Sequence, residues 1–148
     1  MRQRQTNLIY ENNGWRFVFL NGKHTDRLGV RTTRGPSGEF VETSTLERTL
    51  IDIVVRPAYA GGVMAVLECY RQARPKVKIT LLLQALKKLQ YSYPYHQAIG
   101  FYMQRAGYKE SDYLKLRGLG LRFDFYLAHA LTAKSYDPDW RLFYPKGM

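Results

Sequence analysis

The side chains of this chain that could do chemistry are mainly cations, and they gather in one acid-free stretch. Residues 76–109 contain six Lys or Arg residues and no Asp or Glu. The six are Lys76, Lys78, Lys87, Lys88, Arg105 and Lys109. Cations without neighbouring carboxylates can neutralise the phosphates of a nucleic acid and release its counterions. The stretch is therefore our candidate nucleic-acid surface.

Aromatic residues in the same stretch allow two interpretations. Tyr91, Tyr93, Tyr95 and His96 are interleaved with the cations. Such rings can stack on bases while Lys and Arg side chains contact the phosphates. Equally well, two of the tyrosines can pack at the corner between two helices. The sequence alone leaves both interpretations open.

A second cationic patch is expected on a strand near the N-terminus. Arg27 and Arg31 alternate with Leu28 and Val30, so a strand would place the two arginines on one face. The whole chain has 23 Lys and Arg against 12 Asp and Glu, a net charge of +11. This excess favours an acidic partner, either nucleic acid or an acidic protein surface. We expect DNA first and RNA second.

No pattern in the sequence indicates catalysis, a metal site or a cofactor. Cys69 is the one cysteine, and its position beside apolar residues of a helix favours packing over a nucleophilic role. The three histidines lack metal-ligand spacing, and no phosphate-binding loop or dinucleotide fingerprint is present. A metal-dependent nuclease is a remote alternative that would use Asp52 and Asp124. For Asp52 we favour a structural ion pair.

The composition fits a cytoplasmic protein. A single cysteine can form no internal disulfide, which suits a reducing compartment. No apolar segment resembles a signal peptide or approaches the length of a membrane span. We therefore expect no contact with a membrane.

The apolar periodicity predicts one α+β domain over residues 1–148, with residues 1–6 as a flexible arm or linker. The first third alternates around Asn-Gly turn signals, which predicts an antiparallel β-meander with one apolar face. The middle predicts a bundle of about four helices, followed by a short helix at 110–116. Strands at 121–127 and 140–144 are expected to return to the N-terminal sheet, although a helix at 123–133 competes with the first of them.

Residues 44–73 predict the helical corner around which the rest is arranged. Ser44 and Glu47 have the spacing of a capping box, and Arg48 and Asp52 have that of an ion pair on one helix face. Pro57 ends this helix, and two glycines allow a tight entry into the next. We expect these residues to hold the corner rather than to contact a partner. The set is Ser44, Glu47, Arg48, Asp52, Arg56, Gly61 and Gly62.

A longer motif occupies the same corner. It consists of Thr45-Leu46-Glu47-Arg48-Thr49-Leu50-Ile51-Asp52, then Arg56-Pro57, then Tyr59-Ala60-Gly61-Gly62. In this fixed order it resembles the C-terminal domain of AbiEi-type antitoxins of type IV toxin–antitoxin systems. The likeness extends more weakly to residues 140–146, which are similar to the closing strand of that family. A winged helix-turn-helix usually precedes this domain in the family, whereas the sequence here begins with strand-like residues.

The resemblance implies the antitoxin and autoregulatory domain of a bacterial abortive-infection system, which serves in phage defence. It implies regulation of transcription through DNA and no catalysis. The implied partners are nucleic acid and a nucleotidyltransferase-type toxin, which is opposed directly or indirectly. Apart from the resemblance, we consider a homodimer of this chain as a further partnership. The alternative from another class is a protein-interaction module of a phage-defence system that binds no nucleic acid.

Overall fold

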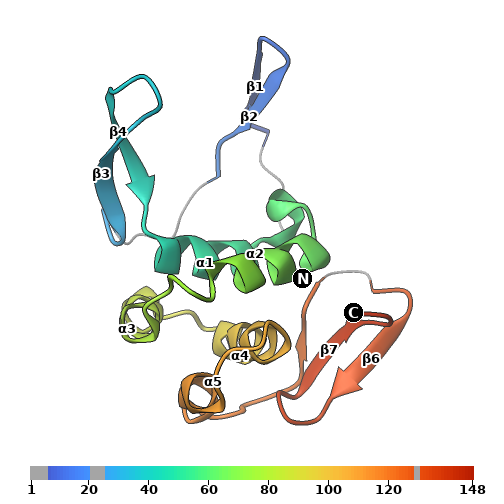
Figure 1. Cartoon of the computed structure of the whole chain (residues 1–148). Helices are drawn as coiled ribbons and strands as arrows, with labels where there is room; N and C mark the ends of the chain where they lie inside the picture. Colours follow the sequence, from blue (N-terminus) through green and yellow to red (C-terminus); the bar gives the residue numbers. More distant parts are fainter. Residues whose placement is uncertain (1–6, 21–25, 129–130) are drawn as a thin grey trace.

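Five α-helices form the body of the molecule in the computed structural model, which describes residues 7–20, 26–128 and 131–148. Each of the first four buries an apolar stripe, as the periodicity predicts. Figure 1 shows two hairpins on one side of these helices and a small sheet beside them. The helices are α1 Leu46–Val55, α2 Val63–Ala73, α3 Ile79–Leu89, α4 Tyr95–Arg105 and α5 Glu110–Arg117, with the 3-10 helix η1 Pro57–Ala60 between α1 and α2.

Two separate β-hairpins precede the helices and project from them (Figure 1). Strand β1 Ile9–Asn12 pairs antiparallel with β2 Trp15–Val18, and β3 Val30–Arg34 pairs antiparallel with β4 Phe40–Ser44. The predicted Asn-Gly turn of the first hairpin is confirmed, because Asn13 and Gly14 both have positive φ, 49° and 76°. The predicted turn at residues 21–22 and the predicted arm at 1–6 lie outside the described residues.

The expected β-meander with one apolar face is wrong in its connectivity. Strands β2 and β3 do not pair, so the four strands form two two-stranded sheets. The side chains of the second hairpin explain this, because neither of its faces is apolar. Arg31 and Thr33 lie on one face, and Thr32 and Arg34 lie on the other. A meander needs a shared apolar face to pack on the helices, and this hairpin offers none.

Stacked tyrosines join the helices in the core. The rings of Tyr70 on α2 and Tyr102 on α4 lie 5.3 Å apart, and both side chains are buried. The Tyr70 hydroxyl donates to the Leu50 carbonyl of α1 at 3.0 Å, and the Tyr108 hydroxyl donates to the Tyr70 carbonyl at 3.0 Å. Burial raises the pKa of Tyr108 to about 12, so this hydroxyl remains a donor throughout the physiological range.

The C-terminal strands form a sheet of their own instead of returning to the N-terminal strands. Its order is β5-β7-β6, built from β5 Phe125–Tyr126, β6 Lys134–Asp137 and β7 Leu142–Pro145. Strand β7 pairs parallel with β5 and antiparallel with β6. The strand expected over 121–127 is thus reduced to two residues. The competing helix over 123–133 is not formed at any described residue of that range.

Trp140 fastens this sheet to α4. Its side chain is 1 % exposed, and the indole ring lies so close to Gly100 that a Cβ there would collide with it. The indole Nε1 donates to Gln104 Oε1 at 2.5 Å, and Gln97 Nε2 donates to the Trp140 carbonyl at 2.7 Å. The backbone N–H of Trp140 donates to Asp137 Oδ1 at 3.1 Å, which secures the turn before β7.

The α+β class is confirmed, with hairpins at the N-terminus, helices in the middle and strands at the C-terminus. Within the described ranges, no helix has both the length and the apolar character that crossing a membrane would require.

Candidate nucleic-acid interface

The helical corner begins with a cap one residue later than the sequence suggests. Thr45, not Ser44, is the N-cap of α1, and its hydroxyl accepts from the Arg48 N–H at 3.4 Å. The Ser44 hydroxyl instead lies 2.7 Å from Thr49 Oγ1. The Glu47 carboxylate does not complete a capping box. It is buried and accepts from the Lys78 N–H at 2.9 Å, which ties the start of α3 to α1.

The predicted Arg48–Asp52 ion pair is confirmed and has a further role. Arg48 Nε lies 2.9 Å from Asp52 Oδ2, and Arg48 Nη1 donates to the Leu28 carbonyl at 2.9 Å. Gly29, with φ 72°, packs so closely on the Arg48 side chain that a Cβ would collide with it. The arginine thus fixes the base of the β3–β4 hairpin to α1. Burial raises the pKa of Asp52, while Arg48 acts in the opposite direction.

The rest of the corner matches its prediction. Arg56 is the C-cap of α1, and Pro57 starts the 3-10 helix that follows. Gly61 and Gly62 have φ of 81° and 91°, a conformation that glycine adopts without strain. All four residues shape the chain between α1 and α2.

Three of the candidate lysines gather where the α2–α3 turn meets the start of α5. Lys76 and Lys78 flank Val77, and Val77 and Lys109 line the same pocket, which has a volume of about 340 Å³. Arg74 is the second cation that lines this pocket, beside Lys109, and it donates to the Gly107 carbonyl at 3.1 Å. The pocket also contains one acid, Asp112, which lies 3.5 Å from Lys115.

Lys87 and Lys88 lie in the last turn of α3, on its outward side. Leu82, Leu86 and Leu89 bury the opposite side of the helix. At 1.5 Å per residue, these two lysines lie roughly 14 Å along the helix from Lys78. Cations near a helix C-terminus are also favoured by the helix dipole. The candidate lysines therefore form two clusters, one at each end of α3.

All five of these lysines are exposed, and none forms an ion pair with another described residue. We call them the α3 lysine surface. Its members are Lys76, Lys78, Lys87, Lys88 and Lys109.

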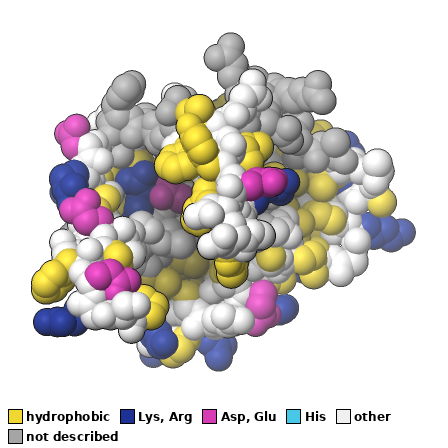
Figure 2. Space-filling model, turned by 90° about the horizontal axis from the view of Figure 1, so that it is seen from above, with side chains coloured by type: hydrophobic (Ala, Val, Ile, Leu, Met, Phe, Trp, Pro, Cys, Tyr) yellow, Lys and Arg dark blue, Asp and Glu magenta, His cyan; other side chains and the backbone are white. Residues whose placement is uncertain are grey.

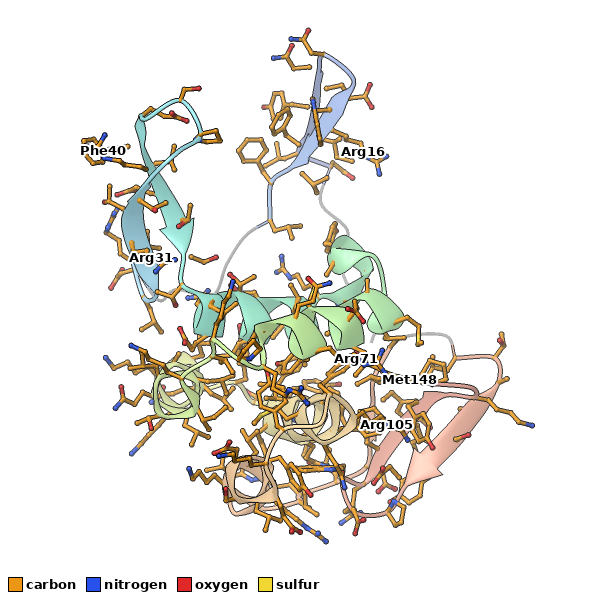
Figure 3. The ribbon with its side chains drawn as sticks, in the orientation of Figure 1. Arg16, Arg31, Phe40, Arg71, Arg105 and Met148 are labelled. Carbon is orange, nitrogen blue, oxygen red and sulfur yellow. The ribbon has the colours of Figure 1, made fainter. Side chains whose placement is uncertain are left out.

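Arg105 does not belong to this surface, contrary to expectation. Its guanidinium donates to the Met148 carbonyl at 2.7 Å and stacks on the rings of Phe101 and Tyr144, at 4.5 and 4.4 Å. Figure 3 shows it beside Met148, between α4 and the C-terminal sheet. Arg105 faces this sheet because it projects from the part of α4 that packs against β7.

The second patch was expected to offer two arginines to a partner. Only one of them, Arg31, forms no ion pair with a described carboxylate. Arg27 lies in the turn before β3 and not on the strand expected there; it binds Glu42 of β4, and this carboxylate raises the pKa of the guanidinium. Arg31 is exposed on β3 (Figure 3). Sequence reasoning missed Arg34, which stacks on the exposed ring of Phe40 at 5.1 Å. The turn signal Gly35-Pro36-Ser37-Gly38 could have indicated that pair, because a hairpin that turns there brings Arg34 and Phe40 together, as the register shows.

The packing interpretation is correct for the aromatic residues after α3. Tyr91 and Tyr95 lie 5.0 Å apart edge to face, and Tyr93 and Tyr95 both contact Phe125 of β5. His96 Nε2 lies 2.6 Å from the Gly120 carbonyl, and burial lowers its pKa. These rings close the α3–α4 corner onto the C-terminal sheet.

The acids considered for a nuclease lie in separate surroundings. Asp124 is exposed and accepts from Arg141 and from the Tyr136 hydroxyl, both at 3.0 Å; Arg141 lowers the pKa of this carboxyl. In the described part of the chain, no three His, Cys, Asp or Glu residues are grouped so that they could hold a metal ion. Cys69 is exposed, so its predicted packing role is wrong; His24 and His129 lie outside the described residues.

Comparisons of the chain with protein-family models, with curated proteins and with solved structures give no match.

Proposed function

We propose that this chain is a cytoplasmic, non-catalytic nucleic-acid-binding module that acts as the antitoxin and autoregulatory domain of a bacterial abortive-infection system. The α3 lysine surface carries the proposal. Its five side chains are exposed and form no ion pair with a described carboxylate, so they are available to phosphates. The chain's excess of cations would also attract nucleic acid from a distance.

The AbiEi-like motif supports the antitoxin part of the proposal through the scaffold. Its residues Glu47, Arg48 and Asp52 join α1 to α3 and to the β3–β4 hairpin. The motif thus builds the support on which the lysines are displayed. A nucleotidyltransferase-type toxin could then be opposed through the DNA of its operon, through its RNA substrate or through an acidic face of the toxin itself.

The β3–β4 hairpin offers a second contact with duplex DNA. A two-stranded β-ribbon fits the major groove of B-DNA. This hairpin projects from the helices and carries Arg31 and several threonines, which are suitable donors to phosphates and base edges (Figure 3). The α3 lysine surface would position the module on the backbone, and the hairpin would lie in or along the groove.

The first test is the salt dependence of binding to a duplex of random sequence. If four or five lysines each neutralise a phosphate, the slope of log K against log salt should lie at about −3 to −5. Fluorescence anisotropy over a range of salt concentrations measures this slope. A flat dependence, or no binding at low salt, would contradict the proposal.

A protein-interaction module without a nucleic-acid role is the second candidate. The observation that favours it is the cluster of exposed aromatic side chains on the β1–β2 hairpin. The same titration separates the two candidates, because a pure interaction module would not bind a random duplex with a steep salt slope.

A further inference from the structure

The β1–β2 hairpin exposes four aromatic rings on one face. Cross-strand register places Tyr10 opposite Phe17, and the same face carries Trp15 and Phe19. These side chains are 60 %, 51 %, 74 % and 57 % exposed in that order. Figure 2 views the molecule from above, so that both hairpins project toward the viewer. Hydrophobic side chains gather near the middle of this view, where the β1–β2 hairpin lies. Single exposed rings are ordinary on protein surfaces, but a contiguous group of four marks an interaction site.

The hairpin itself needs further contacts. A two-stranded hairpin alone is marginally stable in water, and three or more strands or a covering layer are usually required. Here the rings of Tyr10 and Phe19 contact each other at 5.4 Å, edge to face, yet both remain more than half exposed. Covering this face would remove apolar surface from water and stabilise both strands.

In the described part of this hairpin, residues 7–20, the ring face carries no charged side chain. The charged residues of the two strands, Glu11 and Arg16, oppose each other on the other face, and Arg16 points away from the rings in Figure 3. Within residues 7–20, nucleic acid would therefore find no cation on the ring face, and an acidic protein would find no complementary charge. A second copy of the same neutral face would meet no repulsion there, despite the net charge of +11 on each chain.

The area of the face matches what a specific dimer needs. A fully buried aromatic side chain removes about 150–250 Å² from water, so four rings exposed to this degree offer roughly 500 Å² per copy. Two copies would bury roughly 1,000 Å² through the rings alone, close to the lower limit for specific interfaces. Trp and Tyr are also among the residue types most enriched at the positions that dominate binding energy.

From these observations we infer that two copies of this chain associate through the ring faces of their β1–β2 hairpins. The contact is isologous, with Tyr10 and Phe17 of each copy near the two-fold axis. Because the hairpin projects from the helices, the two α3 lysine surfaces stay apart when the faces meet (Figure 1). This inference goes beyond the proposed function and does not depend on it.

Sedimentation equilibrium of the full chain tests the inference. The wild-type chain should change from monomer to dimer with rising concentration. The substitution Phe17→Glu should weaken association about 100-fold or more, because two unpaired carboxylates would be buried at the axis. Tyr10→Glu places the charge on the other strand and should have the same effect. Far-UV circular dichroism checks that the variants remain folded.

The matched control is Phe40→Glu. Phe40 is 73 % exposed on the other hairpin, so this variant carries the same change of charge and ring without touching the ring face. It should associate as the wild-type chain does. A wild-type chain that stays monomeric at every concentration would overturn the inference, as would equal association of all the variants. A single-stranded oligonucleotide that changes the Trp15 emission of a monomeric chain would also overturn it.

Discussion

Replacement of Trp140 by alanine is expected to lower the free energy of unfolding by about 3–5 kcal/mol. The indole is buried against Gly100 and donates to Gln104, and no smaller side chain can fill this site on α4. The substitution leaves a cavity and removes the hydrogen bond that the Gln104 amide oxygen accepts. Chemical denaturation followed by far-UV circular dichroism measures the change.

The chain supplies its own control for this experiment. Its other tryptophan, Trp15, is 74 % exposed on the β1–β2 hairpin. At a concentration where the chain is a monomer, Trp15→Ala should change the free energy of unfolding by less than about 0.5 kcal/mol. If both variants unfolded at the same denaturant concentration, Trp140 would not be the attachment of the C-terminal sheet.

Replacement of Arg48 by methionine is expected to cost about 2–3 kcal/mol of unfolding free energy. Breaking a buried ion pair by removing one partner costs roughly 3–5 kcal/mol, and the figure is reduced here because Asp52 is 43 % exposed. The Leu28 carbonyl also loses its donor. Methionine keeps the apolar stem that packs on Gly29, so the measured loss reports the guanidinium. Thermal or urea unfolding at neutral pH measures it.

The deficit of this variant should depend on pH. Arg48 lowers the pKa of Asp52, so its removal raises the pKa of this carboxyl in the folded state. A folded chain with a raised carboxyl pKa binds its proton more readily than the unfolded chain does. The loss of unfolding free energy should therefore be largest above the pKa that Asp52 has in the folded variant. It should shrink as the pH falls through that pKa. Arg31→Met is the control; a deficit of equal size there would contradict the anchoring role of Arg48.

The helical part of the fold could be predicted from the sequence because its information is local. Apolar residues at helical spacing determine which side of α1, α2, α3 and α4 is buried, and Pro57 and the two glycines mark the corner. The pair Arg48–Asp52 is equally local, since its members lie one helical turn apart. The turn at Asn13 and Gly14 follows from backbone preference alone.

The arrangement of the strands could not be predicted in this way. Alternation identifies a strand, but it does not say whether β2 pairs with β3 or which sheet β7 joins. Pairing depends on contacts between residues far apart in sequence. The attachment of Trp140 to α4 is such a contact. A glycine in the middle of a predicted helix, Gly100, was a signal that some bulky group approaches there.

The sequence predicted most of the lysines of the candidate interface, but it did not predict which arginines would be engaged elsewhere. Five of the six cations in the acid-free stretch are exposed. Lys87 and Lys88 lie on the outward side of α3, and the other three lie in the α2–α3 turn or at a helix start, where Lys side chains remain in water. Arg105 differs, since its stem and guanidinium pack on aromatic rings supplied by a distant strand. Arg27 differs because Glu42 lies on the strand that pairs with β3.

The most direct test of the α3 lysine surface compares two double charge reversals on duplex DNA. Lys87→Glu with Lys88→Glu alters the surface; Lys134→Glu with Lys146→Glu makes the same change of net charge at the C-terminal sheet, which lies on the other side of α4 from α3 (Figure 1). Binding measured by anisotropy at one salt concentration should weaken roughly 10- to 100-fold for the first variant and only a few-fold for the second. Equal losses in both variants, or no loss in the first, would contradict the account.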